Sequence, residues 1–215
     1  MTGKIIVFES KFMGFDDLSP MPNKSAKSAD GICYITQALV FAKRFARSDL
    51  EEQNIFITSK HAIFALLLNV KNPKNPCYIF GAKCAKIAQN MGLNVKYIGY
   101  QKSAKEFFSD LREIKGVFLR GVNVAFSPKK PKMREIICYE TKYLDLSDKL
   151  SGLSDAILIF SSSAQVQNAK NFLANNKSIA LGERTFEALK SLRANAILSP
   201  KMDIEHCIKL AKSLS

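Results

Sequence analysis

The sequence predicts an α/β protein built from two similar parallel-sheet lobes, because one strand–helix–strand–helix pattern occurs twice along the chain. The first copy covers residues 54–88 and the second covers residues 156–189. In each copy an apolar strand ends in hydroxyl residues, a helix follows, and a second strand leads through a glycine into another helix. Alternating strands and helices favour parallel sheets covered on both faces. A long pattern that occurs only twice indicates duplicated domains and not a solenoid.

The N-terminal region is expected to add strands outside the repeat. Residues 4–8 are a short continuous apolar run, typical of a strand that is buried on both faces. The stretch 14–31 is rich in Ser, Pro, Asp and Lys, which predicts a loop with a turn of helix. Residues 32–45 contain many β-forming residues and predict an extended strand or a pair of strands.

The first copy predicts the next elements. Ser59 is a candidate N-cap between a strand at 55–58 and a helix through 62–68. Gly81 separates a strand at 77–80 from the helix that follows it.

The segment between the copies continues the alternation. A strand is expected at 95–98 and an amphipathic helix at 103–111, where Phe and Leu side chains fall on one face. Strands are expected at 116–121 and 136–141, and the polar stretch 144–153 predicts loop and short helix. The second copy then begins at 155, and Asp203 is expected to cap the last helix.

The N-terminal strand has no domain of its own, so the economical arrangement is a discontinuous first lobe. We expect residues 1–37 and 146–215 to form lobe 1 and residues 46–140 to form lobe 2. The chain would then cross between the lobes through β linkers at 38–45 and 141–145.

The net charge of +13 favours an anionic partner, such as nucleic acid, a membrane surface, or a small polycarboxylate or phosphate. A generally Lys-rich composition without functional consequence explains the excess equally well. The basic segment 129–134 is broken by Pro131 and is not interleaved with aromatic residues, which favours a solvated loop over a nucleic-acid-binding arm.

Other features of the composition predict a cytoplasmic protein without a zinc site. No apolar run approaches the ~20 residues of a membrane span, and the N-terminal sequence leads directly into a strand pattern without a signal peptide. The five cysteines are scattered, which is typical of a reduced cytosolic protein. Two distant histidines and isolated cysteines give no zinc-binding spacing.

Hydroxyl residues follow two of the expected strands, at the carboxyl ends where open α/β sheets bind ligands. Their alternative role is N-capping, and one residue can do both. A serine nucleophile is not expected, because no GxSxG motif is present and only His61 and His206 could act as a base. The residues concerned are Thr58, Ser59, Ser161, Ser162 and Ser163.

Gly81 and Gly182 each stand between a strand and a helix, where backbone N–H groups can bind carboxylate or phosphate. The alternative is that glycine only permits a tight turn. Neither is part of a dinucleotide or nucleoside-triphosphate motif. Tyr139 ends a strand, and its phenol could donate a hydrogen bond to a leaving hydroxyl; the alternative is a half-buried tyrosine that only packs its ring.

Taken in order, six short segments make the chain resemble the uroporphyrinogen-III synthase family, and together they span nearly the whole sequence. These segments are residues 55–62, 81–85, 119–121, 138–141, 160–164 and 182–185.

The resemblance implies two α/β lobes, the first discontinuous, joined by a two-stranded β linker. It implies a hydro-lyase that cyclises hydroxymethylbilane, a linear tetrapyrrole octacarboxylate, to uroporphyrinogen III. Water is lost and ring D is inverted, without metal or cofactor. We therefore expect a monomer that acts on this small molecule and has no nucleic-acid or membrane partner.

The resemblance also implies the site residues. Tyr139 corresponds to the tyrosine proposed to assist the loss of water, and Thr185 to a family threonine. Cys84 stands where many members have threonine. The residues implied to bind substrate are Thr58, Ser59, Lys60, Gly81, Ala82, Lys83, Arg120, Ser161, Ser162, Ser163, Gly182 and Thr185.

Two other classes of protein remain open from the residues alone. One is a two-lobed anion- or nucleic-acid-binding protein without catalysis, which would bind with a steep salt dependence. The other is a two-lobed small-molecule sensor, against which the missing export signal counts.

Overall fold

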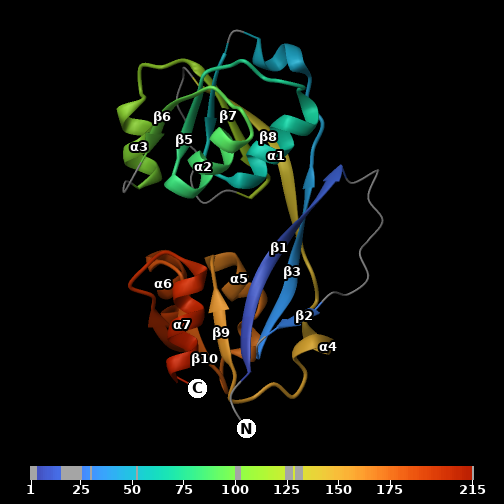
Figure 1. The fold of residues 1–215 in the computed structure, drawn as a ribbon, viewed down its shortest axis with the longest axis vertical. Helices are drawn as coiled ribbons and strands as arrows, with labels where there is room; N and C mark the ends of the chain where they lie inside the picture. The colour runs from blue at the N-terminus through green and yellow to red at the C-terminus, as the bar shows by residue number, and fades with distance from the viewer. Residues whose placement is uncertain are drawn as a thin grey trace. The chain divides into compact units, whose positions relative to one another are not determined.

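The computed structural model describes residues 4–15, 26–29, 31–51, 53–99, 103–123, 128 and 133–214. The chain divides into two compact units. Unit 1 contains Met1–Lys11, Met21–Leu39 and Tyr143–Ser215, and unit 2 contains Phe12–Pro20 and Val40–Lys142. Each unit is an α/β structure with mostly parallel strands, which confirms the α/β class expected from the sequence (Figure 1).

Unit 2 contains the first copy of the repeat. Its sheet has the order β8-β7-β4-β5-β6, and each neighbouring pair is parallel. The strands are β4 (Asn54–Ile57), β5 (Cys77–Phe80), β6 (Val95–Gly99), β7 (Gly116–Gly121) and β8 (Met133–Tyr143). The helices are the short 3-10 helix η1 (Arg47–Leu50), α1 (Lys60–Asn69), α2 (Ala82–Asn90) and α3 (Ala104–Asp110).

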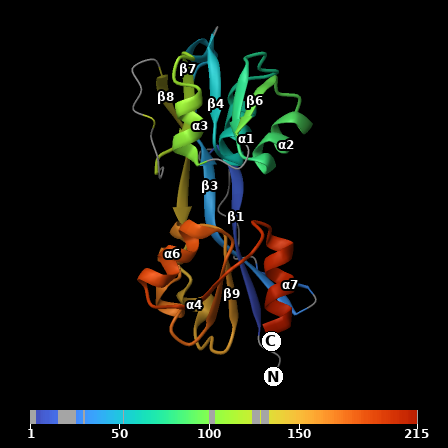
Figure 2. The ribbon, with the colours of Figure 1, turned by 90° about the vertical axis from the view of Figure 1, so that its left-hand side faces the viewer.

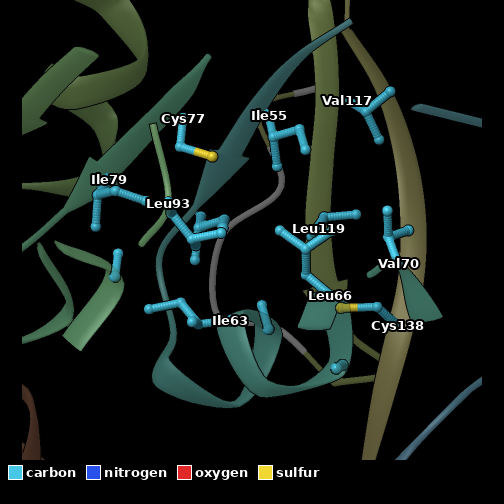
Figure 3. Packing of buried hydrophobic residues seen from close by; sticks show 14 of the residues in the cluster. Ile55, Ile63, Leu66, Val70, Cys77, Ile79, Leu93, Val117, Leu119 and Cys138 are labelled. Carbon is cyan, nitrogen blue, oxygen red and sulfur yellow. The ribbon is translucent and has the colours of Figure 1, made fainter. Parts of the chain in front are cut away.

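Neighbouring residues of a strand point to opposite faces of the sheet, and in unit 2 helices cover both of these faces. On one face Ile55 and Ile57 belong to a core cluster with residues of α1. Figure 3 shows Ile55 of this cluster with Ile63 and Leu66 of α1. On the other face Phe56 belongs to an aromatic cluster with residues of α3. Both faces of β4 are therefore buried, which explains why its sequence is a continuous apolar run.

Unit 1 contains the second copy. Its helices are α4 (Ser147–Leu150), α5 (Ser163–Asn168), the 3-10 helix η2 (Lys170–Phe172), α6 (Glu183–Ser191) and α7 (Ile204–Leu214). Its strands are β1 (Ile5–Phe15), β2 (Ala26–Ala29), β3 (Ile32–Ala42), β9 (Ile157–Phe160), β10 (Lys177–Ala180) and β11 (Asn195–Leu198). The order is β11-β10-β9-β1-β3, with β2 antiparallel to β3.

The same alternation builds the core of unit 1. Leu158 and Phe160 pack on the face that α5 and α6 cover, where Phe160 stacks on Phe8 with 4.9 Å between ring centroids. Ile157 and Ile159 point to the opposite face and pack with residues of α7. Figure 2 shows α6 and α7 on the two sides of β9.

Three long strands contribute residues to both units. The unit boundary falls within β1, within β3 and within β8. The backbone of Lys43 donates to the carbonyl of Cys138 (2.8 Å), and that of Leu144 donates to the carbonyl of Gln37 (2.9 Å). Since the residue numbers rise on one strand as they fall on the other, β3 and β8 are antiparallel here.

Two expectations for the N-terminal region are wrong. The first strand does not stop near residue 8 but continues to Phe15, with half-buried residues in its second part. An apolar-run criterion detects only the fully buried part of such a strand. The predicted loop 14–31 contains β2, a short partner of β3; its residues 16–25 and 30 lie outside the described part of the chain.

Other expected elements agree with the structure. Residues 32–42 form a strand, and Ser59 caps α1 as expected. Asp203 caps the last helix, because its carboxylate accepts a hydrogen bond from the backbone of His206 (3.2 Å). α1 begins at Lys60, directly after its cap.

We predict that Gly116→Ala destabilises the protein. Gly116 is paired with Asn54 across the parallel strands β4 and β7, and a Cβ there would collide with the carbonyl oxygen of Asn54 and the ring of Phe56. Both neighbours belong to a packed core, so the substitution should lower the free energy of unfolding by about 2–3 kcal/mol in urea denaturation. Gly182→Ala is the matched control, since its Cβ would meet only the flexible end of Met202 at 3.3 Å. Equal stability of the two variants would contradict this account of the β4–β7 contact.

Candidate functional site

The residues expected to bind substrate lie at the carboxyl ends of parallel strands, and they form one group in each unit. We call these groups the unit 2 half-site and the unit 1 half-site. The unit 2 half-site contains Thr58, Ser59, Lys60, Gly81, Ala82, Lys83, Arg120 and Tyr139. The unit 1 half-site contains Ser161, Ser162, Ser163, Gly182 and Thr185.

The register of the strands brings the residues of the unit 2 half-site to one edge of the sheet. Ile57 is paired with Ile79 on one side and with Leu119 on the other, so the residues that follow them come out at one edge of the sheet. Gly121 is in turn paired with Tyr139. Three neighbouring strands, β4, β5 and β7, therefore end close together, as expected for parallel strands, although the sequence could not predict their order. Tyr139 does not end a strand as expected, because β8 passes this edge and continues to Tyr143.

The start of α1 carries the first polar groups. The Ser59 side chain accepts a hydrogen bond from the backbone of His61 (3.2 Å), so its own O–H remains available for another acceptor. Thr58 is half-buried and Lys60 is exposed. The first turn of α1 contains no acidic residue, so its positive end is not compensated within that turn.

The start of α2 is similar but uses a different backbone conformation. Gly81 has a φ of 86°, which side-chain-bearing residues rarely adopt, and no atom lies within 4 Å of a Cβ built there. Glycine is therefore required by conformation and not by space. Its N–H donates to the carbonyl of Gly99 (3.1 Å), and Ala82 and Lys83 in the first turn are exposed.

Cys84 belongs to the first turn of α2 and also contacts the first turn of α1. Burial raises the pKa of its thiol, and a hydrogen bond with the backbone of Lys60 and the charges of Lys60 and Lys83 offset part of this effect. The sulfur thus lies beside the first turn of α1, although it belongs to the first turn of α2. A residue at this position links the two anion-attracting helix ends of unit 2.

Arg120 is already engaged by its own unit. Its Nε donates to Glu135 Oε2 (2.5 Å), and a terminal nitrogen donates to the carbonyls of Gly121 (3.0 Å) and Val122 (3.2 Å). The ion pair is largely buried, with exposed fractions of 19% for Arg120 and 23% for Glu135. No pattern in the sequence pointed to this partner, and a contact of Arg120 with substrate stays a prediction.

Tyr139 is placed by an irregularity in β8. The register shifts between Arg120 and Gly121, so that Arg120 is paired with Ile137 but Gly121 with Tyr139. Such a bulge redirects the side chain next to it. The phenol ring lies against Gly121, where a Cβ would be only 2.6 Å from the ring. Tyr139 is half-buried and also packs against the core that α1 covers.

His61 is a member of this half-site that the sequence analysis did not assign. Its ring lies edge-on to the ring of Tyr139, with 5.7 Å between centroids and 66° between planes, and is nearly parallel to the ring of Phe12 (6.3 Å, 9°). Burial, and secondarily the charge of Lys60, lower its pKa to about 4, so the imidazole is neutral at pH 7. Its position two residues after a cap was visible in the sequence, but its contact with Tyr139 was not.

The unit 1 half-site depends on Gln165, another residue that the sequence analysis missed. Its side-chain oxygen accepts from both the backbone (2.7 Å) and the hydroxyl (2.9 Å) of Ser161, and its side-chain nitrogen donates to the carbonyl of Phe8 (3.2 Å). The Ser162 hydroxyl caps α5 by accepting from the backbone of Gln165 (3.3 Å). The spacing Ser162-x-x-Gln165 resembles a capping box and was the available signal.

The start of α6 differs from its counterpart in unit 2. Gly182 has an extended backbone with φ −155°, and Glu183 stands in the first turn, where its charge offsets the positive helix end. Thr185 is 4% exposed, and its backbone donates to the carbonyl of Gly182 (3.0 Å). The helix start at Gly182 is therefore less favourable for an anion than the helix starts of unit 2.

Within the described residues, no group of three or more His, Cys, Asp and Glu side chains is arranged to hold a metal ion. None of the helices in that part of the chain is long and apolar enough to cross a lipid bilayer.

The fold and these two groups define a mostly parallel α/β protein whose polar and helix-start groups gather at the carboxyl ends of its strands. A model of the uroporphyrinogen-III synthase HemD family matches residues 36–209, which is most of the chain. The protein therefore belongs to this family, as the sequence segments suggested.

Solved structures agree on the fold. Uroporphyrinogen-III synthetase from Helicobacter pylori is 20% identical, with a TM-score of 0.71 over 99% of this chain and 100% of that one. A mutant uroporphyrinogen III synthase from the extremely thermophilic bacterium Thermus thermophilus is 14% identical, with a TM-score of 0.53 over 98% of this chain and 100% of that one. At these identities the likeness supports the fold alone. Comparison with curated proteins gives no match.

We predict that His61 makes the protein less stable in mild acid. Because the pKa of His61 is about 4 in the folded protein and ordinarily 6.5, only the unfolded chain takes up this proton as the pH falls from 6.5 to 4. The free energy of unfolding should fall by up to about 3 kcal/mol across this window on account of His61. Urea denaturation at each pH measures the effect. The His61→Phe variant should lose correspondingly less, and identical pH profiles would contradict the burial of a neutral imidazole.

Proposed function

We propose that this protein is a uroporphyrinogen-III synthase, which cyclises hydroxymethylbilane to uroporphyrinogen III with loss of water and inversion of ring D. The family membership supports the class of reaction. The observation that carries the proposal is the position of Tyr139: a register shift in β8 sets its phenol ring against Gly121, where β7 ends, at the edge of the sheet where α1 and α2 begin.

The charge distribution of the unit 2 half-site suits an octacarboxylate. The first turns of α1 and α2 contain no acidic residues, and each carries an exposed lysine, Lys60 or Lys83. Positive helix ends and ammonium groups attract carboxylates and form charge-assisted hydrogen bonds with them. A neutral substrate would gain nothing from this arrangement.

The hydroxyl groups divide into those with a free proton and those without. Ser161 donates its proton to Gln165 and is exposed, so its role is to hold the turn. Ser59 and Ser162 only accept in the bonds that cap their helices, so their protons can be donated to a substrate carboxylate. We therefore assign carboxylate binding to Ser59 and Ser162 and a supporting role to Ser161.

Tyr139 acts on the hydroxyl group that leaves. The electron-rich pyrrole expels this hydroxyl readily, so the protein must mainly hold the flexible substrate in the conformation that closes with ring D inverted. A phenol placed against the departing oxygen donates the proton with which it leaves as water. A reaction that needs mainly positioning of the substrate and one proton donor fits a site that consists of one phenol and several anion-binding groups.

We further propose that units 1 and 2 are the two lobes of the family. Lobe 1 would comprise residues 1–37 and 146–215, and lobe 2 residues 46–140. Strands β3 and β8 would form the two-stranded linker through residues 38–45 and 141–145. The active form would be a cytoplasmic monomer that needs no cofactor and no nucleic-acid or membrane partner.

Isomer analysis tests the proposed activity. Hydroxymethylbilane closes spontaneously to the type I isomer, so the purified protein should divert product to type III, as measured by chromatography of the oxidised porphyrins. Tyr139→Phe should lower kcat by about 100-fold while the variant keeps its thermal unfolding midpoint, because only the acidic proton is removed. Type I product alone from the wild-type protein would refute the activity. Wild-type turnover by Tyr139→Phe would refute only the role of the phenol.

A pair of serine variants tests the assignment of hydroxyls in unit 1. Ser162→Ala should raise KM by about 10-fold, since it removes a donor to a charged substrate group worth roughly 1.5 kcal/mol. Ser161→Ala should change KM by less than about threefold, because its hydroxyl is directed to Gln165. The opposite order of the two effects, in steady-state kinetics with hydroxymethylbilane, would contradict the assignment.

A further inference from the structure

We propose that His61 is a second catalytic residue of this protein and donates a hydrogen bond from Nε2 to the oxygen that leaves hydroxymethylbilane. The inference rests on the proposed function, and it adds a residue that lies in the family segment 55–62 but is not among the site residues that the resemblance implies.

The position of His61 is fixed from three sides. It is the second residue of α1, and its backbone is held by the Ser59 cap at 3.2 Å. Its ring lies between Phe12, which is nearly parallel to it, and Tyr139, which it meets edge-on at 5.7 Å between centroids. The imidazole therefore packs against the ring of the tyrosine that is proposed to give up its proton.

Packing alone does not explain a histidine here. The side chains that follow it in α1 are Ala62, Ile63 and Phe64, and its ring neighbours are aromatic. A phenylalanine would fill the same space. The nitrogen atom instead carries a cost, because Nε2 is buried and no described residue forms a hydrogen bond with it. A buried ring nitrogen without a partner, next to a reacting group, is useful only if something that enters the site binds it.

The protonation state suits a donor and not a general acid. Burial and the neighbouring Lys60 keep the imidazole neutral, and a neutral ring still carries one N–H. A neutral histidine near a helix N-terminus can stabilise negative charge that develops on a substrate oxygen.

The step balances without any further reactant. The bond between the methylene carbon and the hydroxyl oxygen breaks, and its electron pair leaves with the oxygen. The pyrrole nitrogen supplies electron density to the carbon. Tyr139 transfers its proton to the oxygen, which departs as water, while His61 keeps its own proton and holds the oxygen by a hydrogen bond. The proton released when the ring closes restores the phenol.

Kinetics of two His61 variants test the proposal. His61→Phe keeps an aromatic ring between Phe12 and Tyr139 but removes the donor, so kcat should fall by about 100-fold with KM changed less than about threefold. His61→Gln places an amide N–H near the original Nε2 and should recover at least about 10-fold of that loss. His206→Phe changes the other histidine, on α7 in unit 1, and should behave as wild type.

The outcomes distinguish a failure of the proposed activity from a failure of the proposed role of His61. If the wild-type protein forms no type III isomer, both the function and the role of His61 are overturned. If it does, and folded His61→Phe turns over at the wild-type rate or changes only KM, the role of His61 alone is overturned. Should His61→Phe not fold, His61→Gln decides: a folded Gln variant with at least a tenth of wild-type kcat supports the donor, and one as slow as Tyr139→Phe refutes it.

Discussion

The parallel register of β4, β5, β7 and β8 is the constraint on which the rest of unit 2 depends. Because Ile57 is paired with both Ile79 and Leu119, three strands end at one level, and everything that follows them is brought to the same edge. The bulge in β8 then sets Tyr139 opposite Gly121 instead of one residue away. A slip of one residue in this sheet would move Phe56 to the face packed by Ile55 and Ile57 and those residues to the face of Phe56, so the core and the site are fixed together.

The two copies of the repeat have kept their architecture and diverged in their chemistry. Both begin with a buried strand whose last hydroxyl caps a helix, Ser59 in one and Ser162 in the other. The glycines that correspond are not equivalent: Gly81 needs a positive φ, whereas Gly182 is extended. With Glu183 at the start of α6 and lysines at the starts of α1 and α2, unit 2 is the more attractive half-site for anions.

The sequence was sufficient for the elements that depend on local pattern. Buried strands such as 157–160, the caps at Ser59 and Asp203, and the order of strands and helices follow from short-range rules. Contacts between distant residues did not follow from these rules. Glu135 as the partner of Arg120, the ring of His61 beside Tyr139, and the side chain of Gln165 under Ser161 each need the tertiary register. The second half of β1 was missed because its residues are half-exposed and give no continuous apolar run.

The pairing of β1 with β9 has a consequence for how the chain folds as it is synthesised. Ile5 is the parallel neighbour of Ile157, so β1 leaves the ribosome long before its partner exists. Until then β1 can pair only with β3 on its other side, so the four buried apolar residues at its start lack the β9 side of their sheet and are a target for chaperones or for association between nascent chains. Unit 2 lies mostly between these two strands in the sequence, so it can assemble first and unit 1 must close last.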